Sequence, residues 1–188
     1  MWGVLLNDTL RHAALALGAL ALACLIGAPF GLLAATRGWA RGAVLAAAAV
    51  GRTLPSIAVL ALLVPLLGVG APPALAALTL LALPPIVINV DLALRATPAA
   101  VLDVAAGLGM TSTQRFTRVI VPVALPIALA GVRTAGVEVI GSATLATFVG
   151  AGGLGDDIVR GLQTGDPKLL AIASLIVAAM ALVVEIRR

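Results

Sequence analysis

Charged residues are scarce in this chain. Of its 188 residues, 11% are charged and 62% are hydrophobic, whereas a soluble domain usually has ~25% charged and ~45–50% apolar residues. The net charge is +4, but the basic residues are scattered between apolar runs, which argues against a nucleic-acid surface. The sequence therefore predicts a single-domain integral membrane protein whose main solvent is the lipid bilayer.

The side chains that carry most catalytic and metal chemistry are also nearly missing. The chain has one cysteine, one histidine and no tyrosine. Cys24 lies inside an apolar run without a partner, so we interpret it as a small buried hydrophobe. His12 stands beside Arg11 at the edge of an apolar run, and we expect it to be a simple interfacial residue. The sequence predicts no metal site, no cofactor and no enzyme activity, because neither a ligand cluster nor a Ser–His–Asp set is present.

Five apolar runs are candidates for membrane crossing, which needs ~20 residues. The predicted spans are residues 13–35, 43–67, 74–94, 122–145 and 169–184. The first is longer than the ~7–15-residue core of a signal peptide, so we expect a retained helix. The second is predicted to break near Pro55, because proline removes a backbone hydrogen bond and bends the axis. The last is slightly short, and the chain stops abruptly after it, as a truncated chain would.

The basic residues outside the spans are distributed unevenly between the two sides. Seven fall on one side, namely Arg37, Arg41, Arg95, Arg115, Arg118, Arg187 and Arg188. Three fall on the other, namely Arg11, Arg160 and Lys168. Because cytoplasmic loops are enriched in Lys and Arg, this bias predicts an external N-terminus and a cytoplasmic C-terminus. It also places residues 97–122 in the cytoplasm.

Nucleotide-binding motifs give no support for a nucleotide site. No G-K-S/T occurs, so the chain does not bind ATP through the usual P-loop. Residues 150–155 read G-A-G-G-L-G, a formal dinucleotide fingerprint, but the motif requires a preceding strand and this stretch follows an apolar run. We interpret these glycines as an outer turn or gate that needs unusual backbone dihedrals. They are Gly150, Gly152, Gly153 and Gly155.

The longest polar interval between apolar runs, residues 97–122, predicts two short helices that form a compact knob outside the bilayer. Thr97 is a candidate cap with Pro98 in the first turn, and Gly107 or Gly109 would end that helix. Thr111 or Ser112 would cap the second helix, and Pro122 marks the start of the next apolar run.

Asp103 is the distinctive residue of the first of these helices. Its neighbours three or four positions away are all small, namely Ala99, Ala100, Ala106 and Gly107. A carboxylate surrounded by small residues is accessible to the backbone of a partner, although it is equally compatible with a solvated loop helix. An apolar stripe lies beside it, formed by Val101, Leu102, Ala105 and Leu108.

This stretch resembles the EAA loop of permease subunits of ABC importers, in which E-A-A is followed by G and then by a hydrophobe-Pro pair. Asp103-Val104-Ala105, Gly109 and Val121-Pro122 stand at these positions, with Asp replacing Glu and Val replacing Ala. The resemblance implies an all-α membrane fold with a five-helix permease core over residues 9–188. It also implies a coupling helix that docks into a separate ATPase, with contacts from Asp103, Ala105, Gly109, Arg115 and Pro122.

Three other stretches resemble the osmoprotectant branch of these permeases, which transports glycine betaine, choline or carnitine. They are residues 52–56, residues 131–135 with 140–146, and residues 149–156. The resemblance implies two permease subunits, two ATPases and an external receptor in a bacterial plasma membrane. It leaves methionine-type or other amino-acid permeases as the nearest alternative. An ion-coupled secondary transporter, with Asp91 and Glu138 as coupling acids, is the alternative from another class.

Polar residues inside the predicted spans are candidates for the translocation path. Arg133 and Glu138 are charged, and such residues usually face a bundle interior or an aqueous path because of their cost in lipid. Five residues apart, they point to different sides of one helix, and helix or dimer packing is the alternative role of Glu138. The candidate path residues are Thr53, Pro55, Ser56, Asn89, Glu138, Ser142 and Thr144. With only Phe30 and Phe148 as aromatic residues in or near the spans, we expect no tight aromatic cage for a quaternary ammonium ion.

Overall fold

The computed structural model describes residues 2–186, and among these residues every regular element is helical. The α-helices are α1 (Trp2–Thr36), α2 (Gly38–Gly51), α3 (Ser56–Leu67), α4 (Ala71–Arg95), α5 (Ala99–Gly107), α6 (Ser112–Arg115), α7 (Val121–Ala143), α8 (Leu154–Thr164) and α9 (Pro167–Ile186). A π-helical turn, η1 (Phe116–Ile120), joins α6 to α7, and a 3₁₀ segment, η2 (Thr144–Val149), follows α7. The predicted all-α architecture is confirmed. Arg187 and Arg188, which contribute to the charge bias, lie outside the described residues.

Four helical segments are long and apolar enough to cross a membrane: α1, α4, the continuous helix of residues 112–149, and α9. A fifth crossing exists if α2 and α3 are counted as one span, which is bent by 99° at the break between them. Each of the five predicted runs falls within one of these segments. The bend occurs where Pro55 adopts an extended conformation before the first residue of α3, because proline cannot donate the hydrogen bond that would continue α2.

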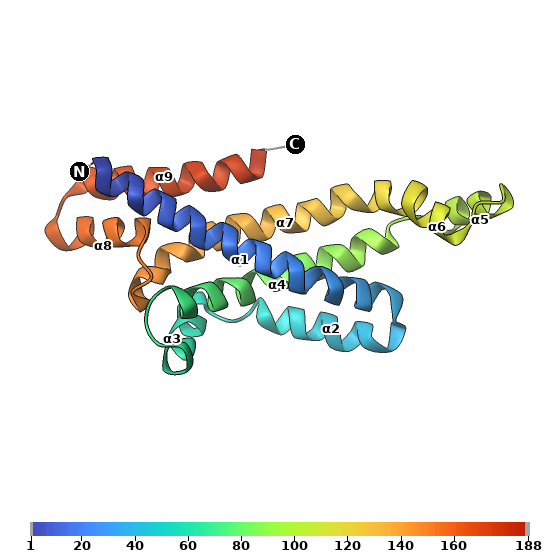
Figure 1. The fold of residues 1–188 in the computed structure, drawn as a ribbon, viewed down its shortest axis with the longest axis horizontal. Coiled ribbons are helices and arrows are strands. Elements are labelled where there is room, and N and C mark those ends of the chain that lie inside the picture. The colour runs from blue at the N-terminus through green and yellow to red at the C-terminus, as the bar shows by residue number, and fades with distance from the viewer. Residues whose placement is uncertain (1, 187–188) are drawn as a thin grey trace.

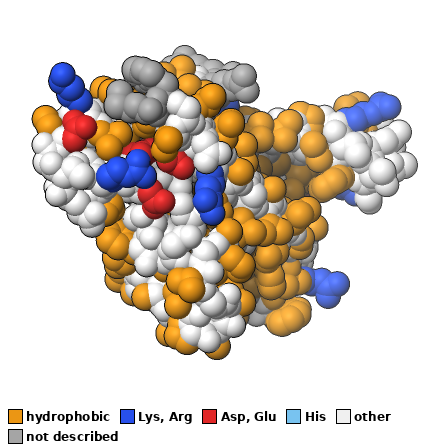
Figure 2. Space-filling model, turned by 60° about the vertical axis from the view of Figure 1, so that its left-hand side comes forward, with side chains coloured by type: hydrophobic (Ala, Val, Ile, Leu, Met, Phe, Trp, Pro, Cys, Tyr) orange, Lys and Arg blue, Asp and Glu red, His pale blue; other side chains and the backbone are white. Residues whose placement is uncertain are grey.

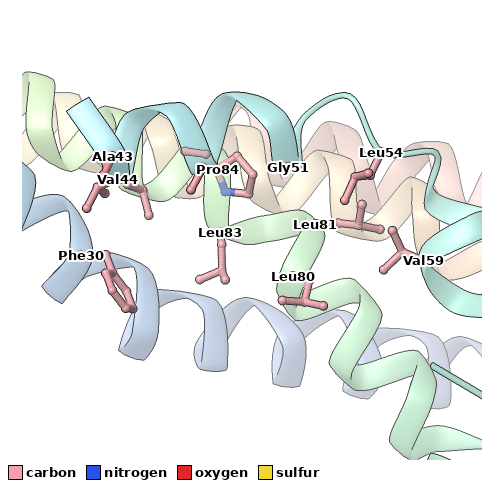
Figure 3. Close-up of a pocket in the computed structure, with 13 residues that line it drawn as sticks. Phe30, Ala43, Val44, Gly51, Leu54, Val59, Leu80, Leu81, Leu83 and Pro84 are labelled. Carbon is pink, nitrogen blue, oxygen red and sulfur yellow. The ribbon is translucent and has the colours of Figure 1, made fainter. Parts of the chain in front are cut away.

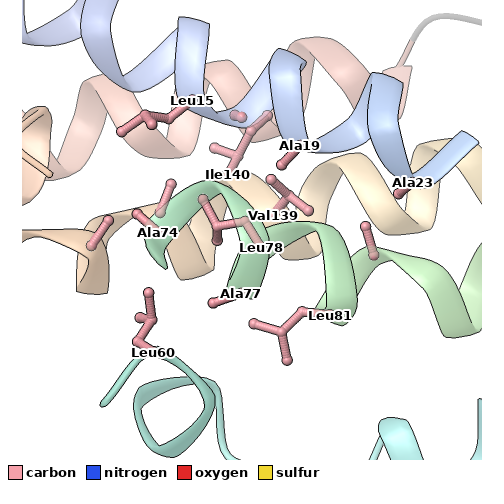
Figure 4. Close-up of a cluster of buried hydrophobic side chains, with 14 of the residues drawn as sticks. Leu15, Ala19, Ala23, Leu60, Ala74, Ala77, Leu78, Leu81, Val139 and Ile140 are labelled. Atoms are coloured by element: carbon pink, nitrogen blue, oxygen red, sulfur yellow. The ribbon is translucent and has the colours of Figure 1, made fainter. Parts of the chain in front are cut away.

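The core is built around α4, which α1, α2, α3 and α7 contact. Figure 4 shows Ala19 of α1 and Val139 of α7 beside Leu78 on α4, with Ala23 further along α1. Small residues set the spacing between the helices. A Cβ added at Gly131 of α7 would lie 2.4 Å from the Asn89 Cβ on α4. Membrane helices approach closely at such residues because packing, rather than the hydrophobic effect, holds them together in lipid.

The knob (residues 97–122) projects from one end of the bundle, whereas α8 and the N-terminal end of α1 lie at the opposite end (Figure 1). The last helix, α9, begins at the α8 end and runs back toward the knob. The two termini of the described chain are therefore directed toward different ends of the helical bundle.

Two details of the predicted knob are wrong. Thr97 does not cap the first helix: Pro98 occupies the N-cap position, and Thr97 is buried with its hydroxyl unbonded. The second helix is also not a separate element, because α6 continues through η1 into α7. The π turn provides the reason. Pro122 lacks an N–H and its ring crowds the carbonyl of Arg118, so the helix widens there instead of ending.

Candidate functional site

The surface of α5 combines an acid with exposed apolar side chains. Asp103 is exposed, and Val104 and Leu108 beside it are 64% and 77% exposed. Ala105 is buried and fixes the opposite side of this short helix. Apolar side chains grouped on a polar projection are typical of a protein interaction surface. The five residues proposed from the resemblance are all in or next to the knob, and their docking role stays a prediction.

Local hydrogen bonds hold the knob in shape. At the end of α5, Met110 N–H donates to the Ala105 carbonyl at 3.2 Å and Gly109 N–H donates to the Ala106 carbonyl at 2.9 Å. This is a Schellman motif, and Gly109 has the positive φ of 77° that it requires.

The cap of α6 is also local. Thr111 N–H donates to Gln114 Oε1 at 2.8 Å, and Gln114 N–H donates to Thr111 Oγ1 at 3.2 Å. This reciprocal pair is a capping box, so Thr111 is the cap of the two candidates, Thr111 and Ser112, that the sequence offered. Arg115 adds a hydrogen bond to Ser112 Oγ at 3.3 Å, and Pro122 is exposed near the start of α7.

The path candidates lie on three different elements. Thr53, Pro55 and Ser56 stand at the break between α2 and α3, where Thr53 Oγ1 donates to the Val50 carbonyl at 2.8 Å. Asn89 is half-buried between α4 and α7, and its amide donates to the Pro85 carbonyl at 2.8 Å. The Thr53 hydroxyl keeps its acceptor capacity, and the Asn89 amide keeps one further N–H and its oxygen.

The helix α7 presents one exposed stripe along its length. Thr134, Glu138 and Gly141 recur at helical spacing on α7 and are all exposed in this chain, and Phe148 of η2 beyond them is exposed as well. Ser142 and Thr144 beside this stripe are half-buried, and Thr144 Oγ1 donates to the Gly141 carbonyl at 2.7 Å. Arg133 lies on a different side of the helix and is also half-buried. Glu138 is an exposed carboxylate in a membrane span, and such a group usually faces a protein neighbour or an aqueous path.

The glycine turn packs against α1. Gly150, Gly152 and Gly153 have φ values of 75°, 77° and 96°, which only glycine adopts readily. Gly155 has ordinary dihedrals, but a Cβ there would lie 2.1 Å from the Thr144 carbonyl oxygen. The turn is therefore defined both by unusual dihedrals and by close approach, while its role as a gate stays a prediction.

The interpretation of His12 as a simple interfacial residue is wrong. Its side chain is 0% exposed, and Nε2–H donates to the Ile140 carbonyl of α7 at 3.0 Å. Gly153 lies against the other side of His12, where an added Cβ would come within 3.3 Å of the His12 Cβ. The signal in the sequence was helical spacing, because His12 falls on the same face of α1 as Leu5, Leu15 and Ala19.

The described residues form two ion pairs, one between two helices and one within a single helix. Arg41 of α2 holds Asp91 of α4 through two nitrogens, with Nε 3.2 Å from Oδ1 and Nη2 3.1 Å from Oδ2. Asp91 is 4% exposed, so one of the two candidate coupling acids of the secondary-transporter alternative is already engaged. The second pair is Arg160 Nη1 with Asp157 Oδ1 at 3.2 Å, within α8.

Asp157 belongs to a polar junction between α8 and α1. Its side chain is 1% exposed, and burial, followed by the negative charge of Asp8 on α1, raises the pKa of this carboxyl. Asp156 is bonded by the hydroxyl of Thr147. Figure 2 shows charged side chains gathered at this end of the molecule, away from the projecting knob and the mainly hydrophobic surface between them. The charged form of Asp157 is therefore disfavoured at this junction, because the carboxyl is buried beside a second acid.

Two cavities are apolar and unsuited to a polar solute. One of about 470 Å³ lies between α1, α2 and α4 beside the break, with Phe30, Val44, Leu83 and Pro84 in its wall (Figure 3). The other, of about 420 Å³, lies between α1, α7 and α9. Within residues 2–186, no group of three His, Cys, Asp or Glu side chains is placed to hold a metal ion.

Comparison with known proteins places this geometry in a family. Residues 27–186 match the family model described as "Binding-protein-dependent transport system inner membrane component". The chain is 36% identical over 183 residues to the choline transport system permease protein OpuBB of Bacillus subtilis (strain 168), which covers 97% of this chain and 84% of the relative. It is 38% identical over 188 residues to the osmoprotectant import permease protein OsmW of Salmonella typhimurium (strain LT2), which covers 97% of this chain and 87% of that protein.

Among solved structures, a chain of the inward-facing MetNI methionine ABC transporter has a TM-score of 0.84 at 23% identity, covering 98% of this chain and 93% of that chain. This likeness shows the fold, whereas the stronger sequence matches favour the osmoprotectant branch over the methionine alternative. The match covers most of the chain, and this protein therefore belongs to the binding-protein-dependent transport system inner membrane component family, as a multi-pass permease subunit of a bacterial ABC importer.

Proposed function

We propose that this permease forms the path for a small osmoprotectant such as glycine betaine or choline, driven by ATP hydrolysis on separate subunits. The observation that carries the proposal is the surface of α5, where Asp103 stands exposed beside Val104 and Leu108. The names of the relatives support the solute class. In this proposal the knob is cytoplasmic, the N-terminus is external, and the C-terminus is cytoplasmic.

The complete transporter proposed here contains two permease subunits, two ATPase subunits and an external receptor. The second permease subunit would cover the exposed stripe of α7 and enclose the path between the two chains. Thr53, Pro55, Ser56, Glu138, Ser142 and Thr144 border this face in the proposal, and Asn89 lies deeper, between α4 and α7.

The continuity of the helix through residues 112–149 suggests how the knob would act on the path. Movement of α6 by an ATPase would be transmitted through η1 and α7, because an unbroken helix resists bending more than a loop does. The same helix carries Glu138 and ends at the turn that begins with Gly150. ATP-driven displacement of the knob would therefore reach both the path and the proposed outer gate.

Selectivity would be set mainly by the receptor. Phe148 is 63% exposed next to the turn and Phe30 borders an apolar cavity, so the spans offer no ring of aromatic side chains for a quaternary ammonium ion. The isolated permease is expected to show no tight binding isotherm for glycine betaine.

The proposal is tested by Asp103→Lys in the transporter reconstituted with its ATPase and receptor. We expect membrane insertion and basal ATP hydrolysis to persist, while solute uptake falls at least tenfold and receptor stimulation of hydrolysis is lost. Glu185→Lys is the matched control, since Glu185 is an exposed acid near the end of α9 and outside the knob. Uptake by Asp103→Lys at the wild-type rate would rule out docking through this residue.

A further inference from the structure

Arg52 and Glu138 are exposed charges at similar depth in the membrane-spanning part. Arg52 directly follows the 14 residues of α2, which corresponds to roughly 21 Å of helix from its first residue. Glu138 lies 16 residues beyond Pro122 on α7, which is roughly 24 Å of helix. Both helices start on the knob side of the bundle (Figure 1). The two charges thus stand at about the same level, near the 99° bend between α2 and α3.

These two side chains are electrostatic neighbours without being an ion pair. The charge of Arg52 acts on the Glu138 carboxylate, but among the described residues the ion pairs within 4.0 Å are Arg41–Asp91 and Arg160–Asp157. Each charge therefore retains free hydrogen-bonding capacity. In each of the two other charged pairs, by contrast, the side chains lie within ion-pair distance of each other.

Small or polar residues adjoin the two charges, and apolar side chains are also exposed near Arg52, such as Leu54 at 51%. Thr53 adjoins Arg52, and Thr134 and Gly141 lie on the same exposed stripe of α7 as Glu138. Charges at this depth are unfavourable against lipid and usually line an aqueous path or a protein interface. Opposite charges that are not paired with each other are available to the two charged ends of a solute.

We propose that Arg52 and Glu138 form a charge-matched station for zwitterionic solutes in the translocation path. The Arg52 guanidinium would hold the solute carboxylate, for which its planar fork of donors is suited. The Glu138 carboxylate would face the cationic nitrogen. This inference rests on the proposed function and assigns the two charged ends of a zwitterionic solute to two residues of the path.

Comparing a zwitterionic solute with a solute that carries only a positive charge tests whether Arg52 binds the carboxylate or merely lines the path. Choline has the cationic nitrogen of glycine betaine but a hydroxyl in place of the carboxylate, so Arg52 has no anion to bind and repels the cation. Removing the charge of Arg52 should therefore impair betaine transport much more than choline transport. Removing the charge of Glu138 should impair both, because both solutes carry the cationic nitrogen.

The test measures uptake of labelled glycine betaine and choline by the complete transporter in proteoliposomes. Arg52→Gln is expected to lower the ratio of betaine to choline uptake at least tenfold, and Glu138→Gln to lower both rates with less than a threefold change in ratio. Arg133→Gln is the control, since Arg133 lies on α7 off the exposed stripe, and its ratio should stay at the wild-type value. An unchanged ratio in Arg52→Gln would overturn the proposal and leave Arg52 a structural role.

A second variant separates lost charge from lost structure. In a Cys24→Ser background, Arg52→Cys is modified with a thiol reagent that carries either an ammonium or a sulfonate group. The ammonium reagent should restore betaine uptake and the sulfonate reagent should not; a residue inaccessible to both reagents would contradict a place in the path.

Uptake by the wild-type protein distinguishes a failure of the proposed osmoprotectant function from a failure of the proposed Arg52–Glu138 station. Wild-type transport of neither solute would count against the proposed osmoprotectant function itself. Wild-type transport of choline without any transport of betaine would overturn the zwitterion station alone.

Discussion

The knob and the opposite end of the bundle are stabilised in different ways. In the knob, a Schellman motif and a capping box satisfy the backbone within a few residues, and the apolar side chains of α5 remain exposed. At the other end, the glycine turn and α8 are held by α1 and α7, through His12, Gly153 and Asp157. The first end is shaped locally and left open for a partner, whereas the second depends on tertiary contacts for its conformation.

The strongest test of this contrast is Gly155→Ala. The new Cβ would lie 2.1 Å from the Thr144 carbonyl oxygen, so the backbone of the turn has to move. We expect a loss of about 3 kcal/mol in the free energy of unfolding, at the upper end of overpacking costs, or failure of the protein to accumulate. Thermal unfolding in detergent measures this effect. Gly42→Ala is the control, because nothing lies within 4 Å of its added Cβ, and equal behaviour of the two variants would refute tertiary control of the turn.

The complementary change at the open end is Leu108→Ser. Leu108 is 77% exposed, so the free energy of unfolding of the permease should change by less than about 0.5 kcal/mol. Association with the ATPase should weaken at least tenfold if the apolar surface of α5 is its docking site. Co-purification and thermal unfolding measure the two quantities on one sample. A matched substitution, Leu175→Ser on the exposed surface of α9, should leave ATPase association intact.

A smaller effect is expected in the pH dependence of the free energy of unfolding, at the end of the bundle that contains α8. Burial and the charge of Asp8 raise the pKa of Asp157 above its unfolded value of ~3.9. The folded state then binds more protons than the unfolded state between these two values, so stability falls as pH rises from about 4 through the raised pKa. Asp156, Arg160 and the neighbouring Arg11 on α1 are the other charged groups of this junction.

Asp157→Asn should remove this dependence and retain the stability that the wild-type protein has in acid. Thermal unfolding across the weakly acidic range measures it, with Asp166→Asn as the comparison. A wild-type stability that rises with pH through this window would reverse the sign and disprove the assignment.

The smallest expected effect is that of Thr111→Ala in the knob. It removes one side of the capping box and should cost about 1 kcal/mol locally. Hydrogen exchange should accelerate in α6 while α8 and α9 remain unaffected, because the cap is local. Faster exchange at both ends of the molecule would show that the knob is not independent.

Local sequence patterns predicted much of the secondary structure of this protein. The scarcity of charge and the apolar runs predicted the membrane helices, and Pro55 predicted the break in the second span. The sequence also offered Thr111 or Ser112 as the cap of α6, and the structure has Thr111. Each of these features depends on residues that are close in sequence. The continuity of α6 with α7 was missed, since the π turn that accommodates Pro122 competes with the expectation that polar residues end a helix.

Only the tertiary structure decided which polar side chains form hydrogen bonds or ion pairs between helices and which do not. His12 meets Ile140 across 128 residues and Arg41 meets Asp91 across 50, and no local pattern encodes either contact. The same holds for the nearness of Arg52 to Glu138, which depends on how α2, α4 and α7 pack. Hydropathy and turn chemistry act between neighbours in the chain, whereas pairing in a bundle depends on the rotation and depth of each helix, which close packing of small residues such as Gly131 sets.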